Sequence, residues 1–380
     1  MINFIRIENF KSLRNVALNL KNLNLFMGLN SMGKSSVIQS LLMLRQSYIR
    51  DNSIKNLYIN NELVSLGNSK DVFYQDADPD DSIKYTLENN TSSFSVKYKY
   101  KEDVDVLSGD ILSAKNEKNL ALFTKSFHYL AADHISPAKT YNAANAANNI
   151  YNQLGNNGEN APYYLAKLSG KKLLNTKLHH NKAKSNLIAH ELDAWMSEIS
   201  PGATILSEEI SELGIVKMSI EFEKKYETTL KSGEKKITSE FTNPYSPVNV
   251  GFGIPYVLPL ILTLLISQPG DLVLIENPES HLHPRGQAEL GKLIALASQS
   301  GVQIICETHS DHIINGIRVA VKENNIDSNK VRLFYFDKNE TTKLETEVTP
   351  INVDKNGELD SYPTGLLDEW GNLMAKLFRW

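Results

Sequence analysis

The sequence predicts an α/β fold, in which a mixed, largely parallel sheet is layered with helices. Two observations carry this prediction. Between residues 248 and 336, short apolar runs typical of strands alternate with stretches that have helical spacing. Near the N-terminus, a glycine-rich loop stands between a short apolar run and a helical stretch. We therefore expect one core built from two separated parts of the chain, one before residue 105 and one after residue 241.

The composition is that of an ordinary globular protein. The chain has 380 residues, of which 41% are hydrophobic and 22% charged. A net charge of −4 argues against a uniformly basic nucleic-acid-binding protein. Cys306 is the single cysteine, which excludes an intramolecular disulfide. Because the chain shows no signal-peptide pattern and its longest apolar run, 257–266, is too short to span a bilayer, we expect a cytoplasmic protein with no membrane partner.

In chain order, the first part predicts strands at 2–8, 16–20, 24–27, 82–87 and 93–98, with a helix that includes 37–44. The middle part predicts a loop or weak helix at 142–160, an amphipathic helix at 185–199, and a hairpin at 213–241 with a charged tip at 230–235. The last part predicts strands at 271–276, 302–306 and 331–336 between helices at 257–265, 286–298 and 311–322.

The glycine-rich loop, residues 28–36, fits the pattern G-x-x-x-x-G-K-[ST] of a phosphate-binding P-loop. Its glycines allow the backbone to wrap a phosphate, and the following helix presents its positive end to the anion. Lys34 is expected to reach the β- and γ-phosphates, and the Ser35 hydroxyl to hold Mg²⁺. The loop predicts a P-loop NTPase with ATP and Mg²⁺ as cofactors, and its candidate phosphate-binding residues are Asn30, Ser31, Gly33, Lys34, Ser35 and Ser36.

Three further side chains are candidates for the chemistry of hydrolysis. Glu276 ends an apolar strand, where an acid can hold Mg²⁺ or its water shell. Glu279 follows three residues later and could orient the attacking water, or alternatively cap the turn near His281. His309 lies just past the next strand, within possible reach of a γ-phosphate, while Ser310 or Asp311 caps the helix that follows.

Several motifs carry a family resemblance. They are Ile7–Leu13, Phe127–Leu130, Leu154–Pro162, Asn249–Gly253, Val257–Pro259, Ile275–Pro284, Glu307–Ile313 and Tyr362–Glu369. Together they resemble compact bacterial AAA/ABC-type ATPases of the SMC, RecF and OLD group that end in a small domain of unknown function (DUF3696-like). The resemblance implies an ABC-type ATPase head in two parts, 1–104 and 241–345, an inserted α+β arm region, 105–240, and a small C-terminal segment, 346–380.

The resemblance also implies roles for individual residues. Gly251 and Gly253 take the place of the signature glycines, which bind the γ-phosphate held by a second subunit, and His309 that of the switch histidine. Such heads hydrolyse ATP when two of them sandwich two nucleotides, which implies a homodimer or a higher homo-oligomer.

This chain departs from the family pattern at three places. Pro255 and Tyr256 stand where the family has Ser-Gln after the signature glycines. Asn277 follows Glu276, the Walker B acid, at the place of the family's catalytic glutamate. His134 stands near the point where the family often has an arginine. An amide cannot accept a proton, so Glu279 is the nearby candidate base and slow hydrolysis is expected.

The sequence leaves three functions open. The first is a dimeric switch or sensor ATPase of a bacterial antiphage defence system, working with a separate effector protein, a nuclease or a toxin. The second is a RecF- or SMC-like DNA repair ATPase that binds DNA or RNA through the basic stretch 167–184. The third is a nucleotide-binding scaffold with little hydrolysis.

Overall fold

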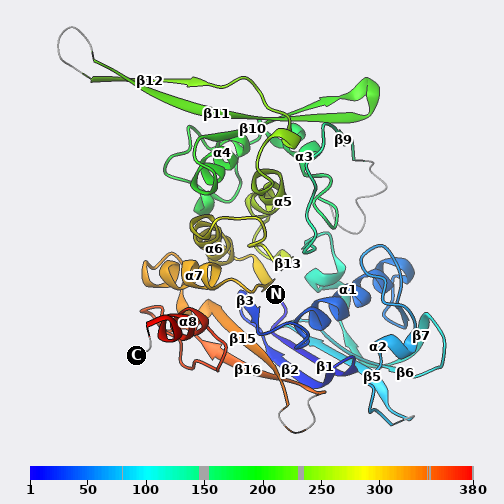
Figure 1. Ribbon diagram of the computed structural model, residues 1–380. Coiled ribbons are helices and arrows are strands. Elements are labelled where there is room, and N and C mark those ends of the chain that lie inside the picture. The colour runs from blue at the N-terminus through cyan, green and yellow to red at the C-terminus, as the bar shows by residue number, and fades with distance from the viewer. Residues whose placement is uncertain (79, 145–153, 230–234, 340, 342–343, 379–380) are drawn as a thin grey trace.

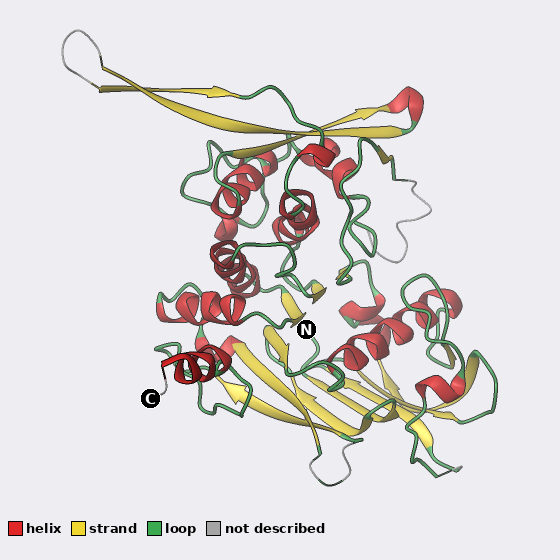
Figure 2. Cartoon of the chain, viewed as in Figure 1, coloured by secondary structure: helices red, strands yellow, loops and turns green. Residues whose placement is uncertain are grey.

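A six-stranded sheet forms the centre of the protein (Figures 1 and 2). The computed structural model describes residues 1–78, 80–144, 154–229, 235–339, 341 and 344–378. In sheet order, the central strands are β16 (Thr346–Asn352), β15 (Val331–Lys338), β3 (Leu23–Met27), β14 (Gln303–Glu307), β13 (Leu272–Glu276) and β8 (Phe127–Leu130). All neighbours pair in parallel except β15 and β16, which are antiparallel. The predicted α/β class is therefore confirmed.

A second, antiparallel sheet is built from the N-terminal part of the chain. In sheet order its strands are β2 (Leu13–Asn19), β1 (Phe4–Phe10), β5 (Ser82–Glu88), β6 (Ser93–Lys99), β7 (Val106–Lys115) and β4 (Asn56–Tyr58). The helix α1 (Lys34–Asp51) shares a hydrophobic core with this sheet and with one face of the central sheet. Phe26 of β3 points into that core, whereas its neighbours Leu25 and Met27 belong to the other one, as the alternation of a strand requires.

Helices cover the other face of the central sheet. These are α5 (Gly253–Ile266), α6 (Pro284–Gln299) and α7 (Asp311–Lys322), and α4 (Ile188–Ile199) and α3 (Ala161–Leu168) pack above them. Cys306, on β14, is fully buried in this core. Two short helices complete the list: α2 (Ser69–Val72) lies beside the antiparallel sheet, and α8 (Glu369–Phe378) lies near the C-terminus (Figure 1).

The middle of the chain forms a third sheet at the end of the molecule remote from the antiparallel sheet (Figure 1). It consists of β10 (Ala203–Ile210), β11 (Ile215–Thr229) and β12 (Lys235–Phe241), with β9 (Tyr141–Asn142) paired to β11. β11 and β12 are the predicted hairpin. Most of its predicted charged tip, residues 230–234, and residues 145–153 of the predicted loop or weak helix lie outside the described residues.

The proposed arm region, 105–240, begins with two strands that belong to the other sheets: β7 extends the antiparallel sheet and β8 pairs with β13 in the central one. The boundaries of the four predicted parts stay a prediction. In the described part of the chain, no helix is both long enough and apolar enough to cross a membrane.

Candidate nucleotide-binding site

The P-loop joins β3 to α1 in the conformation that its glycines permit. Gly28 and Gly33 have φ angles of 131° and 97°, which side chains rarely allow. A Cβ atom at Gly28 would lie 2.1 Å from the Phe336 carbonyl oxygen, so only glycine fits there. Gly33 is the N-cap of α1 and provides no capping side chain. The first N–H groups of the helix are therefore available to an anion.

A cavity of about 320 Å³ opens over this loop. All six candidate phosphate-binding residues line it, and the sequence interpretation missed four others, Lys11, Ser12, Gln39 and Glu307. Lys11 donates to Gln39 Oε1 at 2.7 Å, and burial lowers the pKa of Lys11. The signal for the first two was already present, because they lie in the turn of the Ile7–Leu13 motif. Glu307 ends a core strand, as Glu276 does, and could have been found in the same way.

Lys34 is buried against the loop, with 3% of its surface exposed. Its Nζ donates to the carbonyl oxygens of Gly28, at 2.9 Å, and Leu29, at 2.7 Å. Burial lowers the pKa of Lys34, while the charges of Glu307 and Glu279 act in the opposite direction. The ammonium group is thus held where phosphate oxygens could replace the two carbonyls.

Two carboxylates stand side by side at the ends of neighbouring strands. Glu276 of β13 and Glu307 of β14 are register partners. Tyr129 of β8 donates its hydroxyl to Glu276 Oε1 at 2.9 Å. Burial, reinforced by the charge of Glu307, raises the pKa of Glu276 to about 7, and burial likewise raises the pKa of Glu307. A cation at this edge of the sheet would relieve the repulsion between them.

Glu279 holds the segment that follows β14. Its Oε2 accepts a hydrogen bond from the Thr308 hydroxyl and its Oε1 accepts one from the His309 N–H, both at 2.7 Å. His309 is exposed, and partial desolvation and the charge of Lys34 lower the pKa of its ring. Ser310 is the N-cap of α7, so of the two capping candidates the serine takes this role. Glu279 therefore links the turn after β13 to the Thr308–His309 segment.

Gly251 and Gly253, the expected signature glycines, do not line the P-loop cavity of their own chain. Gly251 is exposed, and a Cβ atom there would have no neighbour within 4 Å. Gly253 starts α5, close to the backbone of His281, and Phe252 between the glycines is 62% exposed. Neither glycine lines the cavity, and Glu276, Glu279 and His309 do not line it either.

The three departures from the family pattern contact one another. The Tyr256 hydroxyl donates to the Ala132 carbonyl oxygen at 2.8 Å and lies 3.3 Å from the Asn277 carbonyl oxygen. The His134 ring stacks on Tyr256, with ring centroids 4.2 Å apart, and its Nδ1 lies 3.0 Å from the Tyr256 carbonyl oxygen. Asn277 has a φ of 46°, a conformation that asparagine tolerates better than most residues do. These residues together fix the turn after β13.

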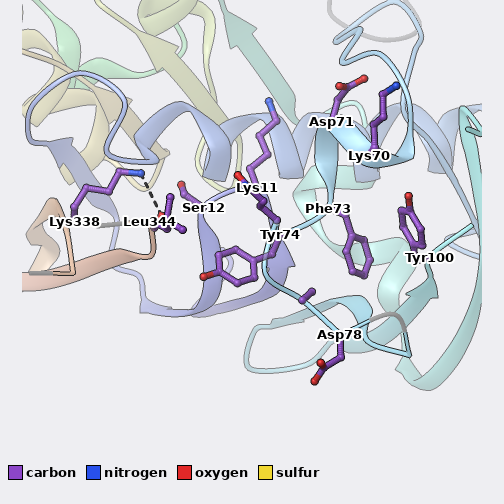
Figure 3. Close-up of a pocket in the computed structure, with 12 residues that line it drawn as sticks. Lys11, Ser12, Lys70, Asp71, Phe73, Tyr74, Asp78, Tyr100, Lys338 and Leu344 are labelled. Carbon is purple, nitrogen blue, oxygen red and sulfur yellow. Dashed lines mark hydrogen bonds between the residues drawn. The ribbon is translucent and has the colours of Figure 1, made fainter. Parts of the chain in front are cut away.

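A second, larger cavity has a volume of about 860 Å³, and Figure 3 shows the residues that line it. Lys11 and Ser12 line both this cavity and the P-loop cavity. Three aromatic side chains, Phe73, Tyr74 and Tyr100, line the larger one, and the Phe73 and Tyr100 rings lie 5.0 Å apart. An aromatic cavity beside a phosphate-binding loop has room for the flat base of a nucleotide.

Among solved structures, the chain is similar to SMC head domains. The SmcHead bound to the C-winged helix domain of ScpA is 13% identical, with a TM-score of 0.49, over 93% of this chain and 99% of that one. The SMC head domain from Thermotoga maritima is 11% identical, with a TM-score of 0.43, over the same shares, 93% and 99%. The Smc head domain with an extended coiled coil from Pyrococcus furiosus, bound to the C-terminal domain of ScpA, is 12% identical, with a TM-score of 0.48, over 99% of both chains.

Family comparisons cover most of the sequence. A search of curated proteins found no match. Residues 326–377 match a protein family of unknown function, DUF3696. Residues 23–315, which contain the P-loop, Glu276, Glu307 and His309, match the family described as "AAA domain, putative AbiEii toxin, Type IV TA system". The resemblance to AAA-type ATPases with a DUF3696-like C-terminus is thus confirmed, and the chain belongs to this AAA-domain family, whose fold is that of a P-loop ATPase.

Proposed function

We propose that this protein binds ATP with Mg²⁺, hydrolyses it slowly, and acts as the nucleotide switch of a bacterial antiphage defence system. The observation that supports the nucleotide part is the P-loop cavity, where Lys34 and the free end of α1 face the same space of about 320 Å³. A triphosphate supplies the negative charge that this space attracts.

The adenosine part of ATP extends, in this proposal, into the adjoining cavity of about 860 Å³. Lys11 and Ser12 line both cavities and would contact the phosphates nearest to the ribose. Tyr74 and Phe73 would offer their rings to the adenine. Asn277 in place of a glutamate supports slow turnover, with Glu279 as the base and His309 near the γ-phosphate.

The switch part of the proposal requires two heads. Gly251 is exposed just before α5, Gly253 is the first residue of that helix, and Phe252 between them is 62% exposed, so this surface is available to a second copy. The family description names a putative toxin system, which favours defence, and a separate effector protein would carry out the response.

The alternative of DNA repair finds less support. Within the basic stretch 167–184, Lys167 pairs with Glu209 and Lys182 pairs with Glu198. Lys184 lies over the Phe241 ring at 5.3 Å. These contacts neutralise or occupy charges that a phosphate backbone would need. A scaffold without useful hydrolysis is the remaining alternative, and turnover measurements separate it from the switch.

Three measurements test the proposed function. Calorimetry with ATP and Mg²⁺ should show binding to the unmodified protein, and a phosphate-release assay should show slow turnover that candidate effector proteins or DNA can modulate. Light scattering on the Glu279→Gln variant, in which hydrolysis is expected to be blocked, should then show a dimer that forms or rearranges when ATP is added. A particle that stays monomeric with and without ATP would contradict the switch.

A further inference from the structure

We propose that Glu307 is a ligand of the Mg²⁺ that accompanies ATP, bound next to the Ser35 hydroxyl. This inference rests on the proposed ATP-binding function. It concerns a residue outside the P-loop and outside the strand that ends in Glu276, and it starts from the order of the strands.

Glu307 stands closer to the P-loop than Glu276 does. It ends β14, the strand that pairs directly with the P-loop strand β3, and its register partner there is Phe26. Glu276 ends β13, one strand farther away. Because paired strands lie about 4.8 Å apart, the two carboxylates start at roughly one and two strand spacings from the loop. Accordingly Glu307 lines the P-loop cavity and Glu276 does not.

The contact with Ser35 has the spacing of two metal ligands. The Ser35 hydroxyl donates to Glu307 Oε1 with the oxygens 2.9 Å apart. Mg²⁺ binds its six oxygen ligands at about 2.0–2.1 Å in an octahedron, so neighbouring ligand oxygens lie about 2.9 Å apart. The hydroxyl and the carboxylate can therefore take adjacent positions around one ion without moving apart.

The second carboxylate oxygen of Glu307 lacks a partner among the described residues, and a bound cation would supply one. Glu307 is 5% exposed, and within the described part of the chain its buried Oε2 has no hydrogen-bond partner. Buried polar atoms nearly always have a partner, and an exception calls for an explanation such as a bound ion. Lys34 does not supply the partner, because its Nζ lies 4.0 Å away, on the side of Oε1, and donates to two loop carbonyls instead.

These observations divide the work among the charged groups. Lys34 binds the phosphates, and Ser35 and Glu307 bind the cation. Glu276 accepts a hydrogen bond from Tyr129 and lies one strand farther from the P-loop than Glu307. A carboxylate is the side chain that a hard cation such as Mg²⁺ prefers, and an amide of the same shape is a weaker ligand.

The experiment uses Mn²⁺ as the probe and electron paramagnetic resonance as the readout, so that it does not depend on turnover. Mn²⁺ is titrated into the full-length protein saturated with a non-hydrolysable ATP analogue. In Glu307→Gln the Mn²⁺ dissociation constant should rise more than about 100-fold, while binding of the analogue without metal stays the same or tightens. A smaller rise, of the ~10- to 100-fold size typical of a residue that only orients a ligand, would place Glu307 outside the coordination shell and overturn the inference. The matched control is Glu289→Gln, an identical change at a partly exposed glutamate of α6 that pairs with Lys292, and its Mn²⁺ affinity should not change.

Other outcomes overturn the inference. One is a Mn²⁺ affinity of Glu307→Gln within twofold of that of the control. Loss of turnover in that variant would then indicate that Glu307 is a base, and loss of Mn²⁺ binding in Glu276→Gln alone would indicate that Glu276 is the ligand. If Glu307→Gln does not fold, Glu307→Asp keeps the charge on a shorter side chain and should weaken Mn²⁺ binding less than about tenfold, and an unchanged affinity there overturns it too. Failure of the unmodified protein to bind the analogue would instead overturn the proposed function itself.

Discussion

Thr346, the first residue of β16, connects the DUF3696 segment, residues 326–377, to the P-loop by a hydrogen bond. It is 7% exposed, its hydroxyl lies 2.9 Å from the Met32 carbonyl oxygen and 2.8 Å from Ser12 Oγ, and its N–H donates to the Ser12 carbonyl at 2.9 Å. Thr346→Val keeps the shape of the side chain and removes the hydroxyl. A carbonyl inside the P-loop and a hydroxyl of the cavity wall then lose their partner.

A buried group left without a partner costs about 1–3 kcal/mol, and because Ser12 and Met32 are only partly buried we expect the lower part of that range. If about 1–2 kcal/mol of it falls on the loop conformation that binds ATP, the dissociation constant rises about 5- to 30-fold. Calorimetry with ATP and Mg²⁺ measures this. Thr346→Ser retains the hydroxyl and should bind nearly as the unmodified protein does, and Thr349→Val makes the same change at an exposed position of the same strand. Equal affinities of Thr346→Val and Thr349→Val would refute the reasoning.

Three further predictions concern the site and its surroundings. Lys34→Ala removes the cation placed at the phosphates, so ATP affinity by calorimetry should fall more than about tenfold, and an unchanged affinity would remove the P-loop from the proposal. If Glu279 is the base, Glu279→Gln should keep ATP binding and slow single-turnover hydrolysis at least ~100-fold. A rate within a few-fold of that of the unmodified protein would mean that Glu279 acts only through its hydrogen bonds to the Thr308–His309 segment. Burial lowers the pKa of His134 to about 4, so below its usual pKa of about 6.5 the unfolded chain binds a proton that the folded protein does not. The free energy of unfolding, measured with urea, should therefore fall by about 2 kcal/mol more between pH 7 and pH 5 in the unmodified protein than in His134→Phe, and equal falls would contradict a buried neutral histidine.

Local patterns were sufficient for the elements and for the phosphate-binding loop. The predicted strand at 24–27, the glycines and the helix that follows appear as β3, the P-loop and α1, because each is specified by residues that are neighbours in the chain. Likewise, the helix at 185–199 is observed as α4 and the hairpin at 213–241 as β11 and β12. All six predicted phosphate-binding residues line one cavity because they belong to one continuous loop.

The partners of that loop depend on the tertiary structure. Nothing in the spacing of the sequence states that β14 rather than β13 pairs with β3, yet this order decides that Glu307 and not Glu276 reaches Ser35. In the same way, the Thr346 hydroxyl forms a hydrogen bond with Ser12, which lies 334 residues away in the sequence. Lys11 lines both cavities because it lies in a turn, where its φ is 49°. The sequence by itself therefore determined the strands, the helices and the phosphate loop, whose interactions are local and periodic. Only the packing of distant strands decided which carboxylate, hydroxyl and aromatic rings surround that loop, because sheet order and side-chain burial arise from contacts between segments that are far apart in the chain.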